Sequence, residues 1–268
     1  MKNFKTRDKT CPHRFTSFNE MVLNRYKLPP NITYVEIGLG HSPFCVFEFR
    51  EALLTKSEHV ISIGIDNNAE CVKNAKRYNK FTHKVCSQTI MGRELDDVSF
   101  ICGSCDLIPK TTTLIRCMNV FRQAYKERDF EMLLNDLDTK ELNCLFFEGS
   151  SRSSDAIENH QPNFYVVNVF VLSNGNHTYK ETIFGRDVGS NISPMDFQSH
   201  LPRIFIEKMH TDEEIAKFMK TWNILWSNIQ KQDNDIKWTE CGEILKEIFP
   251  NLEIHTSFFS YQFQYKKK

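Results

Sequence analysis

The chain has 268 residues, of which 40% are hydrophobic and 25% charged, and its 22 phenylalanines supply ample apolar surface for a core. This composition excludes a largely disordered chain. Lysine plus arginine equals aspartate plus glutamate at 34 each, so no overall charge attracts the protein to nucleic acid or to an anionic membrane.

The chain shows no sign of a membrane partner or of secretion. No apolar run approaches the roughly 20 residues of a membrane-spanning helix, and the first residues lack the apolar core of a secretory signal. Its 9 cysteines have no framework spacing and fit reduced thiols better than disulfides. We therefore expect a cytoplasmic protein.

The first half of the chain alternates apolar runs of strand length with helical patterns. Basic residues are in excess over residues 1–30, which we interpret as a basic arm and a helix over 13–27 that Pro29 and Pro30 end. The expected strands are 33–40, 59–66, 98–102, 113–118 and 143–147, and the expected helices after the first are 43–54, 69–78 and 126–137. This alternation predicts an α/β fold with a doubly wound, Rossmann-like, mostly parallel sheet that has helices on both faces.

The second half changes character and predicts an antiparallel C-terminal addition to the sheet. Two strands, 163–172 and 179–184, flank the turn Ser-Asn-Gly-Asn at 173–176, as in a hairpin. Apolar residues at steps of three and four over 211–230 indicate an amphipathic helix whose stripe belongs to the core. A last helix over 241–249 and a half-exposed strand over 254–265 complete the expectation of a single domain over 31–268.

The strongest candidate site is the end of the first strand, Val-Glu-Ile-Gly-Leu-Gly, with Glu36, Gly38 and Gly40. Glycines there let the backbone approach a ligand closely. Asp66 closes the second strand, where an acidic residue accepts hydrogen bonds from ribose hydroxyls. Pro43 stands where a dinucleotide motif has its third glycine, and no phosphate-cradling pattern is present. The pattern therefore indicates a nucleoside ligand without phosphate.

These residues resemble the class I S-adenosylmethionine-dependent methyltransferase family, over about residues 33–150. Glu36, Gly38 and Gly40 match its first-strand motif at the amino-acid end of the cofactor. The resemblance implies S-adenosylmethionine as the cofactor and a methyl-acceptor substrate that is a small molecule, a protein or RNA. The cofactor-binding residues that it implies are Glu36, Gly38, Gly40, Asp66, Asn67, Ser104, Cys105 and Asn119.

Two segments depart from the pattern of the family. Ser104 stands where an acid often follows the glycine of the third-strand loop, and Asp106 comes two positions later. The segment that contains Asn119 resembles the fourth strand and its loop but lacks the Asp/Asn-Pro-Pro-aromatic motif of many amino-methylating members. No catalytic residue is identified, although Arg122, Tyr125 and Glu148 are expected, like Asn119, near the acceptor side.

Two other classes of function remain open. A methyltransferase-fold binding or scaffold protein without turnover would use the basic arm and Lys266, Lys267 and Lys268, and nucleic acid is its candidate partner. A nicotinamide-dependent oxidoreductase is disfavoured by Pro43. The Cys-x-x-Cys pair at Cys102 has no second pair and no spaced histidine, so no metal site is predicted.

Overall fold

The computed structural model describes residues 14–40, 42–86, 97–121, 127–152, 164–206, 209, 213–231 and 233–264. Contacts divide the chain into two compact units. The first unit consists of Met1–Cys117, Leu133–Phe146 and Leu172–His177, and the second of Met118–Met132, Phe147–Val171 and Thr178–Lys268. The single domain expected over 31–268 stays a prediction.

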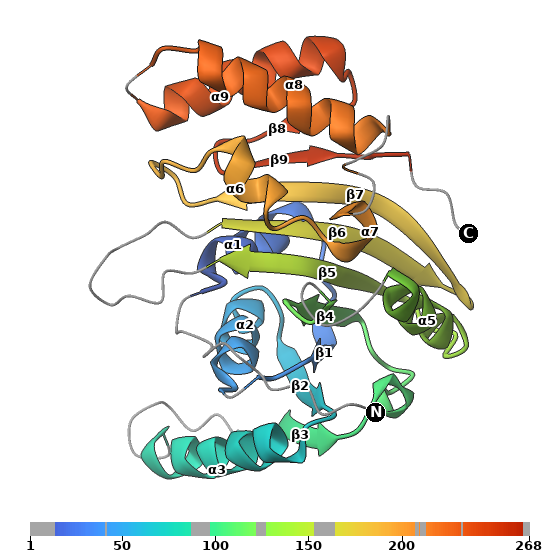
Figure 1. Ribbon diagram of the computed structural model, residues 1–268. Helices are drawn as coiled ribbons and strands as arrows, with labels where there is room; N and C mark the ends of the chain where they lie inside the picture. Colours follow the sequence, from blue (N-terminus) through green and yellow to red (C-terminus); the bar gives the residue numbers. More distant parts are fainter. Residues whose placement is uncertain are drawn as a thin grey trace. The chain divides into compact units, whose positions relative to one another are not determined.

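The first unit is built on parallel strands in the order β3-β2-β1-β4 (Figure 1). In register, Val35 of β1 lies beside Ile63 of β2 and Ile115 of β4. The chain runs outward from β1 to β3 and then returns to the other side of β1, which is the doubly wound order. This confirms the fold class expected from the alternating pattern. The bounds are β1 (Asn31–Ile37), β2 (His59–Asp66), β3 (Val98–Cys102) and β4 (Leu114–Met118).

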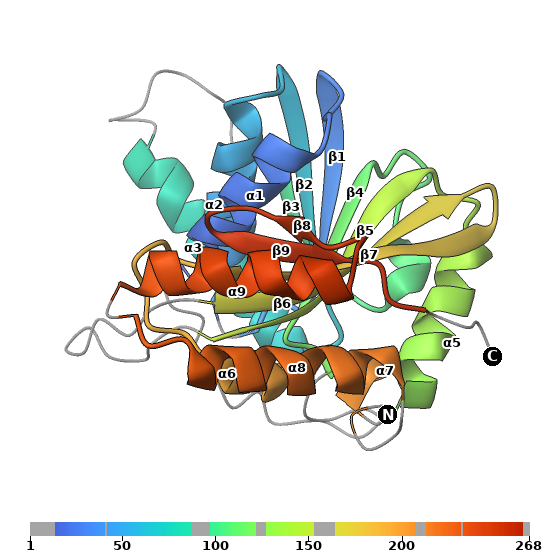
Figure 2. The same ribbon diagram turned by 90° about the horizontal axis from the view of Figure 1, so that it is seen from above.

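Helices cover both faces of these strands. Figures 1 and 2 show α1, α2 and α3 on one side and α5 on the other. Right-handed connections from β1 to β2 and from β2 to β3 place their helices on the same face of the sheet. The helix α3 continues beyond the expected end at residue 78. The bounds are α1 (Thr16–Arg25), α2 (Phe44–Leu54), α3 (Ala69–Cys86) and α5 (Glu127–Asp138).

The second unit contains the antiparallel strands. Its strand order is β5-β6-β7-β9-β8, and β9 runs antiparallel to both β7 and β8. The expected hairpin is present, and its turn belongs to the first unit: Asn174 and Gly175 connect β6 to β7 with φ of 50° and 78°, as a type I′ turn requires. The bounds are β5 (Cys144–Arg152), β6 (Phe164–Ser173), β7 (Asn176–Arg186), β8 (Glu253–Ile254) and β9 (Phe258–Tyr261).

Aromatic side chains fill the core of the second unit between the strands and the helices α8 (Glu214–Asn228) and α9 (Asn234–Ile248). Trp222 of α8 is fully buried and lies edge-on to Phe184 of β7 at 5.5 Å between ring centroids. Trp238 of α9 stacks on Phe259 of β9 at 4.0 Å. The apolar stripe expected over 211–230 therefore lies in the core.

Three expectations for the second half need correction. The last helix begins at Asn234 because the Asp233 side chain accepts hydrogen bonds from the N–H groups of Asp235 and Ile236 and caps it. The single strand expected over 254–265 is two strands, β8 and β9. Two short helices, α6 (Pro194–Gln198) and α7 (Arg203–Ile206), were not expected.

Some expectations fall on residues that the structure does not describe. These are the basic residues before residue 14, the candidates Arg122 and Tyr125, and the lysines that end the chain. In the described part, no helix combines the length and the apolar character that crossing a membrane would require. Free thiols are present at Cys45, Cys71, Cys102, Cys105, Cys117, Cys144 and Cys241.

Candidate functional site

A glycine turn follows β1 at the carboxyl end of the strand. Gly38 and Gly40 have φ of 85° and 64°, a region that side chains other than glycine enter only with strain. The N–H of Gly38 donates to the carbonyl of Ile65 over 2.8 Å, so the turn leaves β1 against the end of β2. The two glycines therefore hold a backbone shape that presents N–H groups at the edge of the sheet.

Asp66 closes β2 and binds this turn through its carboxylate. Its Oδ2 accepts hydrogen bonds from the N–H groups of Leu39 at 2.8 Å and Gly40 at 3.3 Å. Its Oδ1 accepts from the N–H of Asn68 at 2.8 Å, at the start of α3. The structure thus brings together the two features that sequence reasoning singled out, 26 and 27 residues apart in the chain.

Leu39 and Gly64 were not predicted as part of the site, and they fix the position of the turn. Leu39 lies between the two turn glycines and is 1% exposed. A Cβ atom on Gly64 would lie 2.5 Å from Cδ2 of Leu39 and 2.7 Å from Cδ1 of Phe100. The Ile-Gly-Ile sequence of β2 could have indicated this contact, because a glycine inside a strand often marks a position that another group approaches closely.

Glu36 lies inside the first unit and is 1% exposed. Its Oε2 accepts a hydrogen bond from Nε of Arg116 at 2.6 Å, and the hydroxyl of Tyr34 donates to the same oxygen. Burial raises the pKa of Glu36 to about 7, although the Arg116 charge lowers it. The carboxylate is therefore connected to the glycine turn through the backbone of β1 and not by a side-chain contact.

Arg116 was not expected in any role, and its guanidinium connects three elements. Besides Glu36 of β1, it donates to Oδ1 of Asn19 in α1 at 3.0 Å and to the carbonyl of Cys45 in α2 at 2.7 Å. The ring of Phe49 lies 4.5 Å from the guanidinium carbon, a cation–π distance. No local pattern could have revealed a network whose members come from such distant segments.

The loop after β3 lies beside the end of β2, since the N–H of Gly103 donates to the Asp66 carbonyl over 3.0 Å. The hydroxyl of Ser104 donates to the carboxylate of Asp106, and a single 3-10 turn, η2 (Cys105–Leu107), follows. Burial and the nearby Asp136 raise the pKa of the Cys105 thiol, which keeps it protonated. In the described part, no three histidine, cysteine or acidic side chains come together as metal ligands would.

The segment between Asp66 and α3 is exposed at Asn67. The side chain of Asn68 accepts a hydrogen bond from the N–H of Glu70 at 3.0 Å and so caps the first turn of α3. Asn67 therefore stands at the surface beside the Asp66 carboxylate, while its neighbour starts the helix.

Asn119 belongs to the second unit, unlike the other predicted cofactor residues. Its side chain accepts from the N–H of Ser151 at 2.9 Å and donates to the hydroxyl of Ser151 at 3.3 Å, and its own N–H donates to the Gly149 carbonyl. The amide therefore ties the end of β4 to β5 within that unit. Glu148, also of the second unit, is 2% exposed and accepts a hydrogen bond from Asn168 at 3.2 Å.

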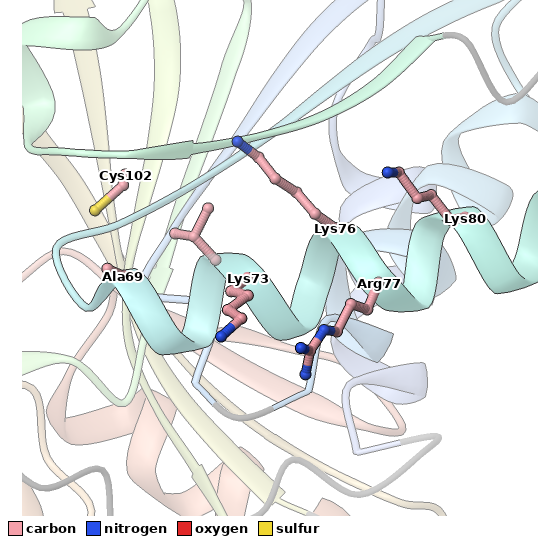
Figure 3. A pocket seen from close by; sticks show the side chains of 7 residues that line it. Ala69, Lys73, Lys76, Arg77, Lys80 and Cys102 are labelled. Carbon is pink, nitrogen blue, oxygen red and sulfur yellow. The ribbon is translucent and has the colours of Figure 1, made fainter.

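A hollow of about 360 Å³ opens between α3 and the end of β3 (Figure 3). Ala69, Val72 and Cys102 line it beside the segment that follows Asp66. Its other lining residues are basic side chains of α3: Lys73, Lys76, Arg77 and Lys80.

The sequence matches no protein-family model and no curated protein. Part of the chain is similar to solved structures. One is a putative methyltransferase of Haloferax volcanii in complex with the Trm112 methyltransferase activator, with 20% identity over 51% of this chain and 52% of that chain, and a TM-score of 0.36. A second is a magnesium protoporphyrin IX methyltransferase from Synechocystis PCC 6803 with bound SAH, with 14% identity over 51% and 55% of the chains and a TM-score of 0.37.

A third is a SAM-dependent methyltransferase from Aquifex aeolicus, with 17% identity over 56% of this chain and 72% of that chain, and a TM-score of 0.37. The match spans about half the length of the Haloferax volcanii and Synechocystis proteins. The doubly wound fold of the first unit is therefore assigned from its own strand order and register.

Proposed function

We propose that the protein is an S-adenosylmethionine-dependent methyltransferase that binds its cofactor at the carboxyl ends of β1 and β2. The observation that carries this proposal is the contact between the Asp66 carboxylate and the N–H groups of Leu39 and Gly40. It joins a glycine turn to an acidic strand end at the edge where open parallel sheets bind ligands.

The residues at this edge fit a nucleoside. An ionised carboxylate has about four acceptor positions, and three backbone N–H groups use three of those of Asp66, which leaves one for a ribose hydroxyl. The contact with Gly40, at 3.3 Å, is the weakest of the three and the easiest to exchange for a ligand. Pro43 is the N-cap of α2 and stands where a dinucleotide motif has its third glycine, which supports a ligand without pyrophosphate.

The other predicted cofactor residues take different roles in this proposal. Asn67 and the loop of Ser104 and Cys105 flank the adenine base of the cofactor. Asn67 follows Asp66 directly in the chain, and the loop is held beside Asp66 by the hydrogen bond from the N–H of Gly103. Glu36 positions the glycine turn from inside the unit through β1. Asn119 shapes the end of β4 through Ser151.

The sulfonium of S-adenosylmethionine supplies an activated methyl group, so the protein needs to align an acceptor and exclude water more than to provide an acid or a base. The turn of Gly38 and Gly40 and the carboxylate of Asp66 would hold the donor at a fixed place. We assign no catalytic residue, and the acceptor is a small molecule, a protein or RNA.

Calorimetric titration with S-adenosylmethionine and S-adenosylhomocysteine tests the proposal. We expect the wild type to bind both and Asp66→Ala to lose binding, because it loses the ribose acceptor and the bond that holds the turn. Asp97→Ala is the matched control. Asp97 immediately precedes β3 and so lies at the amino ends of the parallel strands, away from the carboxyl end of β2 that carries Asp66. This variant should bind like the wild type.

No binding by the folded wild type would overturn the proposal and would favour the scaffold protein without turnover. Equal binding by the wild type and Asp66→Ala would also contradict it, since the ligand would then lie elsewhere. Circular dichroism of each variant separates a lost site from a lost fold.

A further inference from the structure

We propose that the basic face of α3, formed by Lys73, Lys76, Arg77 and Lys80, binds the phosphate backbone of a single-stranded nucleic acid. This inference rests on the proposed function, because it names that strand as the methyl acceptor. The binding surface itself can be tested without the cofactor.

The hollow beside α3 is lined mostly by basic side chains. Four of its lining side chains are basic and none is acidic, although the whole chain has 34 basic and 34 acidic residues. Figure 3 shows that Lys76 and Lys80 point to the side of α3 where β3 lies. Lys73 and Arg77 point to the other side of the helix. The positive charge is therefore concentrated locally, on both flanks of one helix face.

Among the described residues, these four charges have one weak ionic contact. Lys73 lies 3.9 Å from Glu70, at the limit of an ion pair, and both side chains are exposed. In the part of the chain that the structure describes, Lys76, Arg77 and Lys80 make no ion pair. Like charges three and four residues apart destabilise a helix, so this arrangement is unfavourable unless an anion neutralises it.

The spacing of the charges along α3 fits a stacked nucleic-acid strand. Residues 73 to 80 rise by about 10 Å along the helix axis, which matches about three nucleotides of a stacked strand at about 3.4 Å each. The hollow begins at Ala69 and Cys102, next to the segment that follows Asp66 and the loop that starts at Gly103. A strand held along α3 would therefore lead toward the carboxyl end of β2.

The surface fits a nucleic acid better than a membrane. An interfacial helix needs exposed apolar side chains that enter the lipid. Over residues 69–80 of α3, the apolar side chains of Cys71, Val72 and Ala75 are buried, and none of the large exposed apolar residues lies there. This part of the helix therefore offers its cationic rim to a partner.

The test measures the binding of a short fluorescein-labelled single-stranded RNA by fluorescence anisotropy, from roughly 50 to 200 mM salt. The variant Lys76→Ala/Arg77→Ala/Lys80→Ala removes three of the proposed phosphate contacts, and alanine preserves the helix. The matched control is Lys217→Ala/Lys220→Ala/Lys246→Ala, which removes three exposed charges from α8 and α9. Both variants are also titrated with S-adenosylhomocysteine.

We expect the slope of log K against log salt to fall by about two in the α3 variant, since each phosphate contact contributes about 0.7 on a single strand. The control should keep the slope of the wild type, and both variants should keep the cofactor affinity. Equal slopes for the wild type and the α3 variant, or a wild type that binds anionic phosphatidylserine vesicles but not RNA, would overturn the inference. If RNA binds and the cofactor does not, the proposed function fails and the α3 surface stands as a nucleic-acid site alone.

Discussion

Arg116 of β4 donates a hydrogen bond of 2.6 Å to Glu36 of β1, and the two residues are direct partners in the parallel register of these strands. Their side chains are 0% and 2% exposed. Because β1 ends in the glycine turn, this buried pair holds the strand that presents the candidate site. Removing one member of such a pair leaves the other without compensation in the interior.

Arg116→Met should lower the free energy of unfolding by about 3 to 5 kcal/mol at pH 8. Methionine fills part of the volume but leaves the hydrogen-bond acceptors at Glu36, Asn19 and Cys45 without their donor. Urea unfolding measures the change, and Arg77→Met, on the exposed face of α3, should change stability by no more than about 0.5 kcal/mol.

The double variant Glu36→Gln/Arg116→Met sharpens this test. It leaves no buried charge at the pair, so we expect it to be more stable than Arg116→Met alone. If the double variant loses as much free energy of unfolding as the two single variants together, the two side chains act independently.

The stability of the protein should depend on pH through Glu36. Burial raises its pKa from the ordinary value of 4.5 to about 7 in the folded state, so the folded state holds a proton that the unfolded chain releases. This contribution is fully present below pH 4.5 and is lost as the pH rises through 7. The difference corresponds to about 3 kcal/mol.

Urea unfolding of the wild type and Glu36→Gln over this pH range isolates the contribution, because glutamine cannot titrate. The stability of the wild type relative to the variant should fall as the pH rises. Glu70→Gln, at an exposed position, is the control and should follow the wild type. A constant difference between the wild type and Glu36→Gln would mean that the carboxylate stays ionised throughout.

The sequence predicted the parallel part of the fold well because buried strands leave a clear pattern. The bounds of β2 and β3 agree with the expected runs 59–66 and 98–102, which are short apolar segments between polar ones. Prediction was poorer where tertiary contacts decide the structure. The segment after α9 alternates like one strand, but His255 hydrogen bonds back to Phe258 and divides it into two.

The candidate site was predicted in part for a similar reason. Asp66 and the glycine turn each close a strand, and parallel neighbours bring their carboxyl ends together, so local pattern was sufficient. Glu36 matched a motif equally well, yet its carboxylate points into the unit because Arg116, 80 residues later, pairs with it there. Such a partner is chosen by strand order, which no spacing in the sequence encodes.

Gly64→Ala should weaken both the fold and the site. A Cβ atom there would lie 2.5 Å from Leu39 and 2.7 Å from Phe100, so one of them must move, at about 1 to 3 kcal/mol of stability. Leu39 has little freedom, because its N–H is bonded to Asp66 and its side chain is buried. Displacing it shifts the glycine turn, and we expect affinity for S-adenosylhomocysteine to fall several-fold.

Two further variants separate this effect from general destabilisation. Gly189→Ala in the second unit has φ of 79° and no neighbour within 4 Å of the added Cβ, so it should cost about 1 kcal/mol through backbone strain and leave the affinity unchanged. Leu39→Ala in the Gly64→Ala background removes the clash with the leucine and should restore part of the affinity if the crowded side chain is what moves the turn. Calorimetry that finds the same affinity in Gly64→Ala and the wild type would show that the ligand does not depend on where Leu39 holds the turn.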